Sequence, residues 1–248
     1  MTGAYSRLAD LFEYLNEDCD YDSWSQYLYE RLCAFGVTGG AGVDAGCGSG
    51  AFTRRFAARG FSMTGFDASE AMLSKAEQLS RGMQRRPLYF QADVRACRLP
   101  RRADFALCVN DCLNYLPPQD LPAAFSHLAG CLRAGGVLLA DVSSPQKLRE
   151  ESGNNTFCED RDELAYLGFN RREGERVEMD FTLFVREADG RFSRADEHHT
   201  QYIHEAAALR AAAEGAGFSV EECGLIPCGG RYGSRIGMTC VRKKAVKE

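Results

Sequence analysis

Three closely spaced glycines provide the strongest chemical signal in this chain. Gly46, Gly48 and Gly50 follow directly on a short apolar run, residues 41–45. Glycine permits a tight turn and lets the backbone approach a ligand closely, and the amides of a following helix can donate hydrogen bonds to that ligand. The spacing also satisfies the dinucleotide pattern G-x-G-x-x-A, so the glycines alone leave more than one nucleotide ligand open.

Three aspartates narrow the chemistry of that turn. Asp44 lies two residues before the first glycine, Asp67 ends the second predicted strand and Asp93 ends the third. An acid at the end of strand two suits a ribose diol, because both hydroxyls can donate to a carboxylate. The additional acid at the end of strand three is the feature that discriminates against a dinucleotide.

Alternating strands and helices must position these residues. We predict strands over 41–45, 62–66, 87–92, 104–109 and 137–142. We predict helices over 49–59, 70–79 and 119–132, with Ser69 as the N-cap of the second. This alternation indicates an α/β fold with a parallel sheet, in which ligands bind beyond the carboxyl ends of the strands.

The flanking segments have a different character. Residues 5–35 have the spacing of two amphipathic helices, residues 146–175 are polar and loop-rich, and two alternating runs joined by Asp189-Gly190 predict a hairpin. A helix over 205–216 and strands over 219–226 and 235–241 close the chain. The resulting division is an N-terminal helical segment (1–38), an α/β core (39–145), a loop and hairpin insertion (146–204), and a closing helix with two strands (205–248).

Four motifs in this order resemble those of the class I S-adenosyl-L-methionine-dependent methyltransferases. They are residues 43–50, 65–73, 91–94 and 132–139. The resemblance covers about residues 40 to 143. It implies a Rossmann-like sheet with an N-terminal helical lid and an antiparallel hairpin insertion. It also implies S-adenosyl-L-methionine as cofactor and S-adenosyl-L-homocysteine as product.

The resemblance assigns the methionine half of the cofactor to the first turn. The Gly46 carbonyl and the nearby backbone would hold the methionine amino group, and Asp44 would pin the turn and attract that ammonium. Val109 and Asn110, just past strand four, would line the methionine end. The other turn residues expected at the cofactor are Ala45, Cys47, Gly48 and Gly50.

The adenosine half would be held by the second and third motifs. Asp67 would accept both ribose hydroxyls, while Ala68 and Met72 would pack on the adenine. Asp93 would accept from the adenine amino group, and the Val94 amide would donate to a ring nitrogen. The alternative for both aspartates is simple capping of a helix or loop.

The N-terminal helices and the late hairpin resemble those of bacterial small-molecule methyltransferases, including aminosugar N,N-dimethyltransferases. Tyr5, Tyr14 and Tyr21 are then candidates to cover the sulfonium, because an electron-rich ring face suits a cation. The alternative is that these tyrosines only pack the lid.

Candidates for an acceptor-side base are few. Strand alternation puts Glu197 and His199 on one face and His198 on the other, so we expect the first two to face the pocket as catalytic residues. The alternative is a solvated strand end. Further substrate-side candidates are Asp111, Asn114, Tyr202 and Arg231.

Composition and charge exclude several classes of partner. With a net charge of -5 and no dense basic run, we expect no nucleic acid partner. The 11 cysteines form no C-x-x-C pair, so we predict no metal site and free thiols in a cytoplasmic protein, monomer or homodimer. No apolar run is long enough for a membrane.

Three functional hypotheses remain. The first is a methyltransferase acting on a nitrogen or oxygen of a small molecule. The second is an RNA or protein methyltransferase of the same fold. Asn110-Asp111-Cys112-Leu113 lacks the N-P-P-Y signature of enzymes that methylate DNA bases or protein glutamine. The third is a non-catalytic module that senses S-adenosylmethionine or another nucleoside.

The Asp67→Ala variant tests the assignment of the cofactor. We expect it to weaken S-adenosylmethionine binding by about tenfold or more in calorimetry, because the ribose hydroxyls lose a charged acceptor. NADH binding without S-adenosylhomocysteine binding would instead establish the dinucleotide interpretation.

Overall fold

A seven-stranded sheet forms the centre of the protein. The computed structural model describes residues 9, 13, 19–226 and 234–244. The strand order is β10-β11-β5-β4-β1-β2-β3. The strands are β1 (Ala41–Ala45), β2 (Ser62–Asp67), β3 (Leu88–Gln91), β4 (Ala103–Cys108), β5 (Leu132–Ser143), β10 (Phe218–Leu225) and β11 (Arg235–Arg242). The strand order reverses between β1 and β4, which is the switch point where such sheets bind ligands.

Most neighbouring strands of this sheet run parallel, as the sequence predicts. The pairs β1–β2, β1–β4, β2–β3 and β4–β5 are parallel, whereas β11 runs antiparallel to both β5 and β10. No described helix lies between β10 and β11, so the chain returns in the opposite direction rather than by a crossover.

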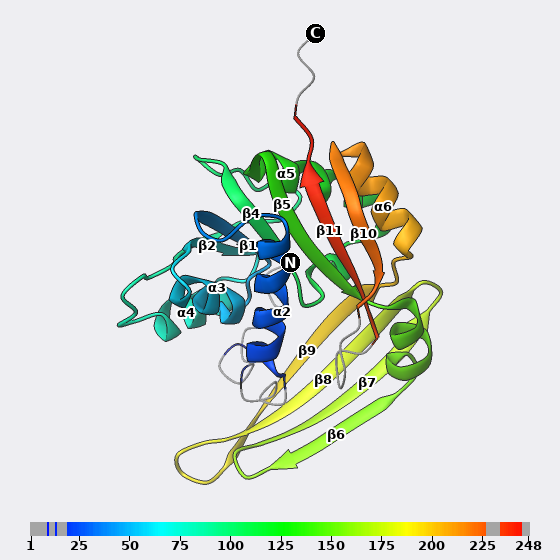
Figure 1. Cartoon of the computed structure of the whole chain (residues 1–248). Coiled ribbons are helices and arrows are strands. Elements are labelled where there is room, and N and C mark those ends of the chain that lie inside the picture. Colours follow the sequence, from blue (N-terminus) through cyan, green and yellow to red (C-terminus); the bar gives the residue numbers. More distant parts are fainter. Residues whose placement is uncertain (1–8, 10–12, 14–18, 227–233, 245–248) are drawn as a thin grey trace.

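Helices cover both faces of this sheet (Figure 1). They are α2 (Tyr21–Ala34), α3 (Ala51–Ala58), α4 (Glu70–Leu79), α5 (Leu121–Cys131) and α6 (Ala206–Gly215). One hydrophobic cluster joins α2 and α3 to one face, and another joins α5 and α6 to the opposite face. Ser69 caps α4 as predicted, because its hydroxyl accepts from the Met72 amide at 3.3 Å. The α/β fold is therefore confirmed.

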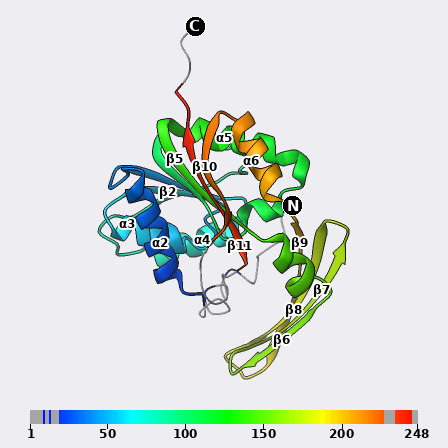
Figure 2. The same cartoon turned by 45° about the vertical axis from the view of Figure 1, so that its right-hand side comes forward.

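The insertion is a second sheet rather than a hairpin with loops. Its strand order is β6-β7-β8-β9, with all pairs antiparallel. The strands are β6 (Thr156–Arg161), β7 (Leu164–Glu173), β8 (Arg176–Arg186) and β9 (Phe192–Tyr202). Figure 2 shows this sheet projecting away from the core. The expected hairpin is β8–β9, and Gly190 in its turn has a φ of 83°.

The loop-rich interpretation of residues 146–175 is wrong. A short π-helix (Lys147–Ser152) precedes β6 and β7 in this segment. Strand β6 pairs on one side only and alternates exposed with half-buried residues, so it needs no strongly apolar sequence. The left-handed Gly174, between β7 and β8, is the local signal of the additional turn.

The other expectations about the chain ends have mixed outcomes. The first predicted N-terminal helix lies outside the described residues, apart from Ala9 and Glu13. The division into four segments stays a prediction. Within the described ranges, no helix combines the length and apolar character required to cross a membrane.

The missing side chain at Gly42 leaves room for two buried side chains from the neighbouring strands. A Cβ there would lie 2.2 Å from the Phe105 ring and 2.6 Å from the Met63 sulfur. We expect Gly42→Ala to lower the free energy of unfolding by about 1–3 kcal/mol, because the buried ring must shift. Urea denaturation measures this change as a lower midpoint with an unchanged slope.

Gly39→Ala is the matched control, because nothing lies within 4 Å of its Cβ position. We expect its free energy of unfolding to stay within about 0.5 kcal/mol of the native value. Equal midpoints for the two variants would contradict the packing argument.

Candidate functional site

The turn after β1 has a backbone that glycine suits best. Gly46, Gly48 and Gly50 have φ values of 68°, 53° and 79°, in the left-handed region. A Cβ on Gly46 would lie 2.3 Å from Cys112 Sγ, and one on Gly50 would lie 2.5 Å from Tyr89 Oη. The spacing of the glycines therefore reflects both backbone conformation and close contact with neighbouring elements.

The Asp67 carboxylate, at the end of β2, accepts hydrogen bonds from backbone amides on both sides of it. Its Oδ2 accepts from the Gly48 amide and its Oδ1 from the Ser69 amide, both at 2.9 Å. Burial raises the pKa of Asp67 above its usual range, although these amide hydrogen bonds oppose the shift. A carboxylate has about four acceptor sites, so each oxygen keeps capacity for another donor such as a ribose hydroxyl.

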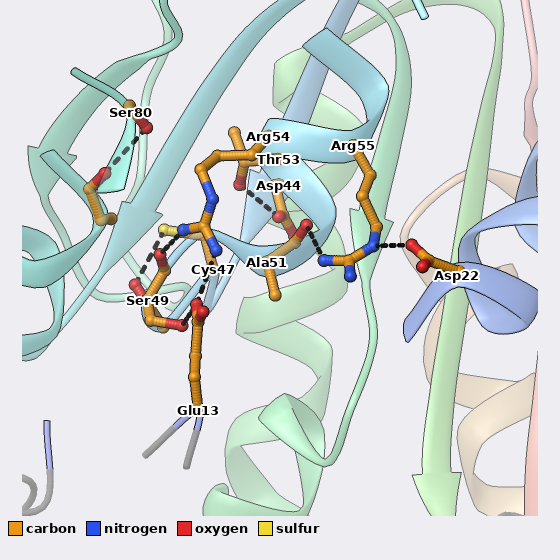
Figure 3. A network of polar contacts seen from close by, with 12 residues as sticks. Glu13, Asp22, Asp44, Cys47, Ser49, Ala51, Thr53, Arg54, Arg55 and Ser80 are labelled. Carbon is orange, nitrogen blue, oxygen red and sulfur yellow. Dashed lines mark hydrogen bonds and ion pairs between the residues drawn. The ribbon is translucent and has the colours of Figure 1, made fainter. Parts of the chain in front are cut away.

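Asp44 is buried beneath the turn. Its Oδ2 accepts from the Thr53 hydroxyl at 2.5 Å, which ties the end of β1 to α3 (Figure 3). Burial raises the pKa of Asp44 to about 7, the Thr53 hydrogen bond opposes this shift, and the charge of Asp67 adds to it. A cation bound beside Asp44 would therefore be strongly coupled to its ionisation.

Asp93 lies after β3 and is engaged by an arginine that the sequence reading missed. Arg95 donates from Nε to Asp93 Oδ1 at 2.9 Å and also forms an ion pair with Asp120 at 2.6 Å. Hydrogen bonding from Arg95 holds the pKa of Asp93 below its usual value. The neighbouring Val94 is buried. The role of Asp93 toward an adenine amino group stays a prediction, and any such group would share the carboxylate with Arg95.

Ala68 and Met72 differ in exposure. Met72 is buried, and its Cε would lie 3.1 Å from a Cβ on Gly48. Ala68 is exposed, and its carbonyl accepts from Gln91 Nε2 at 2.9 Å. Ala68 therefore lies in the turn after β2 and Met72 next to the turn after β1, and their contact with adenine stays a prediction.

The segment after β4 is held by a buried charge network. Asn110 and Asp111 have φ values of 60° and 72°, which are unusual for non-glycine residues. The Asn110 amide donates to Asp141 on β5 at 3.1 Å, and the buried Arg235 of β11 donates to Asp111 at 2.6 Å and to Asp141 at 2.9 Å. Val109, directly before this turn, is buried.

Two predicted substrate-side residues, Asn114 and Tyr202, lie where the core meets the insertion sheet. Asn114 is fully buried, and its amide accepts from the Ser143 amide at 2.9 Å and donates to the Tyr202 carbonyl at 3.0 Å. Strand alternation places the Tyr202 side chain on the opposite face of β9 from His199. The buried Asn114 side chain therefore connects β5 to β9 as part of the scaffold, whereas the substrate-side role of the Tyr202 side chain stays a prediction.

Asp111, a predicted substrate-side residue, belongs to the buried charge network. Its Oδ1 accepts from the Ser143 hydroxyl at 2.8 Å and forms the ion pair with Arg235. Burial raises the pKa of Asp111, but the charges of Arg235 and Lys147 outweigh burial and hold it below its usual value. The network therefore favours the ionised carboxylate of Asp111, and its substrate-side role stays a prediction.

The predicted pair on β9 does lie together. His199 Nε2 lies 3.1 Å from Glu197 Oε2, and the two side chains are only 2% and 1% exposed. His198 is exposed on the other face. The solvated alternative is therefore wrong for His199 and Glu197, while their catalytic role stays a prediction. Tyr115, which the sequence reading missed, places its Oη 3.5 Å from His199 Nδ1.

The N-terminal segment contacts the first turn. Glu13 accepts from the Ser49 hydroxyl at 2.7 Å and from Arg54 at 2.6 Å, as Figure 3 shows. Tyr21 is buried at the start of α2 and packs edge-on against Phe52, with ring centroids 5.5 Å apart. This favours the packing alternative for Tyr21. Tyr5, Tyr14 and Arg231 lie outside the described residues.

Comparison with known proteins identifies the family. Residues 43–136 match the methyltransferase domain family. A relative from Geobacillus sp. (strain WCH70), provisionally named a methyltransferase, is 30% identical over 222 residues, which are 88% of this chain and 90% of the relative. The chain belongs to the S-adenosylmethionine-dependent methyltransferases.

Two solved structures share the whole architecture with this methyltransferase. The S-adenosylmethionine-dependent methyltransferase of Clostridium acetobutylicum ATCC 824 superposes with a TM-score of 0.86 at 25% identity, covering 97% of this chain and 99% of its own. CalS10, an amino pentose methyltransferase of Micromonospora echinaspora with S-adenosylmethionine bound, has a TM-score of 0.75 at 21% identity, covering 93% and 94%.

The residues of this methyltransferase fit its cofactor. The left-handed glycines form a turn with no side chains beyond Cα at three positions, and Asp67 beside it accepts two amide hydrogen bonds and keeps capacity for further donors. We expect Gly46 and Asp44 to hold the methionine end and Asp67 the ribose. S-adenosylmethionine supplies an activated methyl group, so the protein's task is to align an acceptor with it.

The ionisation of Asp44 provides a pH test of this arrangement. Below its pKa of about 7 the carboxyl carries a proton, whereas a bound methionine ammonium would require the charged form. We expect the affinity for S-adenosylmethionine to fall as pH decreases from about 7 to 5.5, approaching tenfold per pH unit, because binding must release that proton. The ligand's own amino group stays protonated over this range. Calorimetry at several pH values measures the effect.

Asp44→Asn is the control for this prediction. It keeps the size of the side chain, and we expect weaker binding that no longer depends on pH in this range. Equal dissociation constants of the native protein at about pH 5.5 and 7 would contradict the pairing of Asp44 with the ammonium.

Proposed function

We propose that this methyltransferase transfers the methyl group to a nitrogen or oxygen atom of a small molecule. The observation that carries the proposal is the enclosed polar pair His199–Glu197 on the inner face of the insertion sheet. That face meets the segment after β4 through Tyr115 and His199. Enclosed polar groups next to the segment after β4, where we expect the methionine end of the cofactor, suit an acceptor that enters a pocket and is surrounded there.

The apolar surroundings of the pair support the same conclusion. The Phe181 ring lies edge-on to His199 with ring centroids 5.6 Å apart, and Tyr166 lies edge-on to Phe181 at 6.4 Å. Register places Phe181, Glu197 and the neighbouring Gly168 side by side on this face. An apolar wall with a few convergent polar atoms is typical of small-molecule sites.

The relatives and the charge of the chain favour this acceptor class over a nucleic acid. CalS10 is an amino pentose methyltransferase, and its likeness to this chain extends over 93% of the residues. The net charge of -5 disfavours RNA, whose phosphates usually require a basic surface. An amine or hydroxyl of a sugar-sized molecule is therefore the acceptor that we favour.

Transfer of a labelled methyl group tests the proposal. The protein is incubated with methyl-labelled S-adenosylmethionine and with glucosamine, benzylamine, catechol, or a cell extract separated into small-molecule and macromolecular fractions. We expect label in the small-molecule arms, and at least about a tenfold loss of label with Asp67→Ala, because that variant weakens donor binding.

His198→Gln is the matched control, because His198 lies exposed on the far face of β9. We expect it to label the same acceptor at the native rate. Label confined to RNA or protein would overturn the small-molecule proposal.

A further inference from the structure

We infer that Tyr115 is a catalytic residue that contacts the acceptor and relays its proton to His199, which Glu197 orients. This inference rests on the proposed function, since it describes the acceptor side of that site. It adds a third residue, from a different element, to the pair on β9. It also explains how a pair sealed from solvent can take part in the chemistry.

The short helix after β4 directs Tyr115 toward the cofactor turn. Residues Cys112–Tyr115 form a single 3-10 turn, in which side chains three positions apart lie on the same side. Cys112 faces the first turn, because its Sγ would lie 2.3 Å from a Cβ on Gly46. Tyr115 shares that side, whereas Leu113 and Asn114 between them are fully buried in the scaffold.

The imidazole of His199 lies between a phenol and a carboxylate. Tyr115 Oη is 3.5 Å from Nδ1, and Glu197 Oε2 is 3.1 Å from Nε2. One neutral tautomer satisfies both contacts: Nε2–H donates to the carboxylate, and the Nδ1 lone pair accepts from the phenol. The longer contact is at the outer limit of hydrogen bonding, and such contacts commonly shorten when substrate binds.

Exposure assigns each residue its position in the relay. The His199 and Glu197 side chains are 2% and 1% exposed, whereas Tyr115 is only partly buried. From β8, His199 is flanked by Met179 in register and by the ring of Phe181, neither of which titrates. Of the three polar groups, Tyr115 is therefore the one placed to contact an acceptor.

The relay conserves charge through the transfer. The acceptor's lone pair forms the bond to the methyl carbon, and the bond from that carbon to sulfur breaks with its electron pair left on sulfur. The acceptor's proton moves to the Tyr115 oxygen as the Tyr115 proton moves to Nδ1 of His199. The positive charge lost from sulfur is thus regained on the imidazolium, which the adjacent Glu197 carboxylate stabilises.

Two variants and a spectroscopic measurement test the relay. Nitrogen NMR of the protein with S-adenosylhomocysteine should show His199 protonated on Nε2, and Tyr115→Phe should shift the Nδ1 resonance. The assay uses the small acceptor to which the native protein transfers the labelled methyl group. We expect Tyr115→Phe to lower kcat by about 100-fold and to leave KM for S-adenosylmethionine within about threefold of the native value.

His199→Gln should lose a similar factor, and the double variant should lose no more than either single one, because the residues act as a unit. His198→Gln, on the opposite face, is the control for a general effect on the sheet. Denaturant unfolding of each variant separates a relay defect from misfolding.

Each outcome distinguishes the relay from the proposed function. A proton on Nδ1 of His199, or turnover of Tyr115→Phe within about threefold of the native rate, would overturn the relay while leaving a small-molecule acceptor in place. Absence of any labelled small acceptor would overturn the proposed function, and the tautomer of His199 would then decide whether the relay geometry exists.

Discussion

Both halves of the site depend on the ion pairs of one buried guanidinium, that of Arg235. It forms ion pairs with Asp111, which follows β4, and with Asp141, which lies on β5. Burial lowers the pKa of Arg235, but the two carboxylates outweigh burial and raise it, so the group stays charged. Burial raises the pKa of Asp141, and Arg235 opposes that shift. Removing one member of such a network typically costs about 3–5 kcal/mol, because a buried charge is left without compensation.

This network positions the cofactor half and the acceptor half together. Through Asp141 it holds the left-handed Asn110, directly before the short helix that places Cys112 against Gly46 and Tyr115 against His199. Asn114, in the same helix, connects β5 to the end of β9. The insertion sheet is therefore attached to the core at the point where the network fixes the backbone, so donor and acceptor sides share one scaffold.

Features that nearby residues determine could be predicted from the sequence, whereas features that depend on distant residues could not. The left-handed backbone of the glycine turn, the cap at Ser69 and the turn of the β8–β9 hairpin are each set by residues within a few positions of one another, and each was predicted. The segment 146–175 was misread, because β6 is a half-exposed strand whose partner, β7, supplies its stabilisation. The polar composition of this segment carries little information about which strands pair. The scaffold role of Asn114 was missed because its two partners lie 29 and 88 residues away.

By itself, the sequence determined that this chain is a methyltransferase and predicted the residues of its donor site. Its glycines and aspartates act through backbone conformation and through hydrogen bonds at the ends of adjacent parallel strands, so their order along the chain encodes their arrangement. Only the tertiary structure brought Tyr115 and the charge network together with the predicted pair on the proposed acceptor side. Tyr115 and His199 are 84 residues apart, and the charge network joins Asp111 to Arg235 across 124 residues. Contacts at such separations exist only after packing has closed the intervening loops, and no local pattern of residue types specifies that packing.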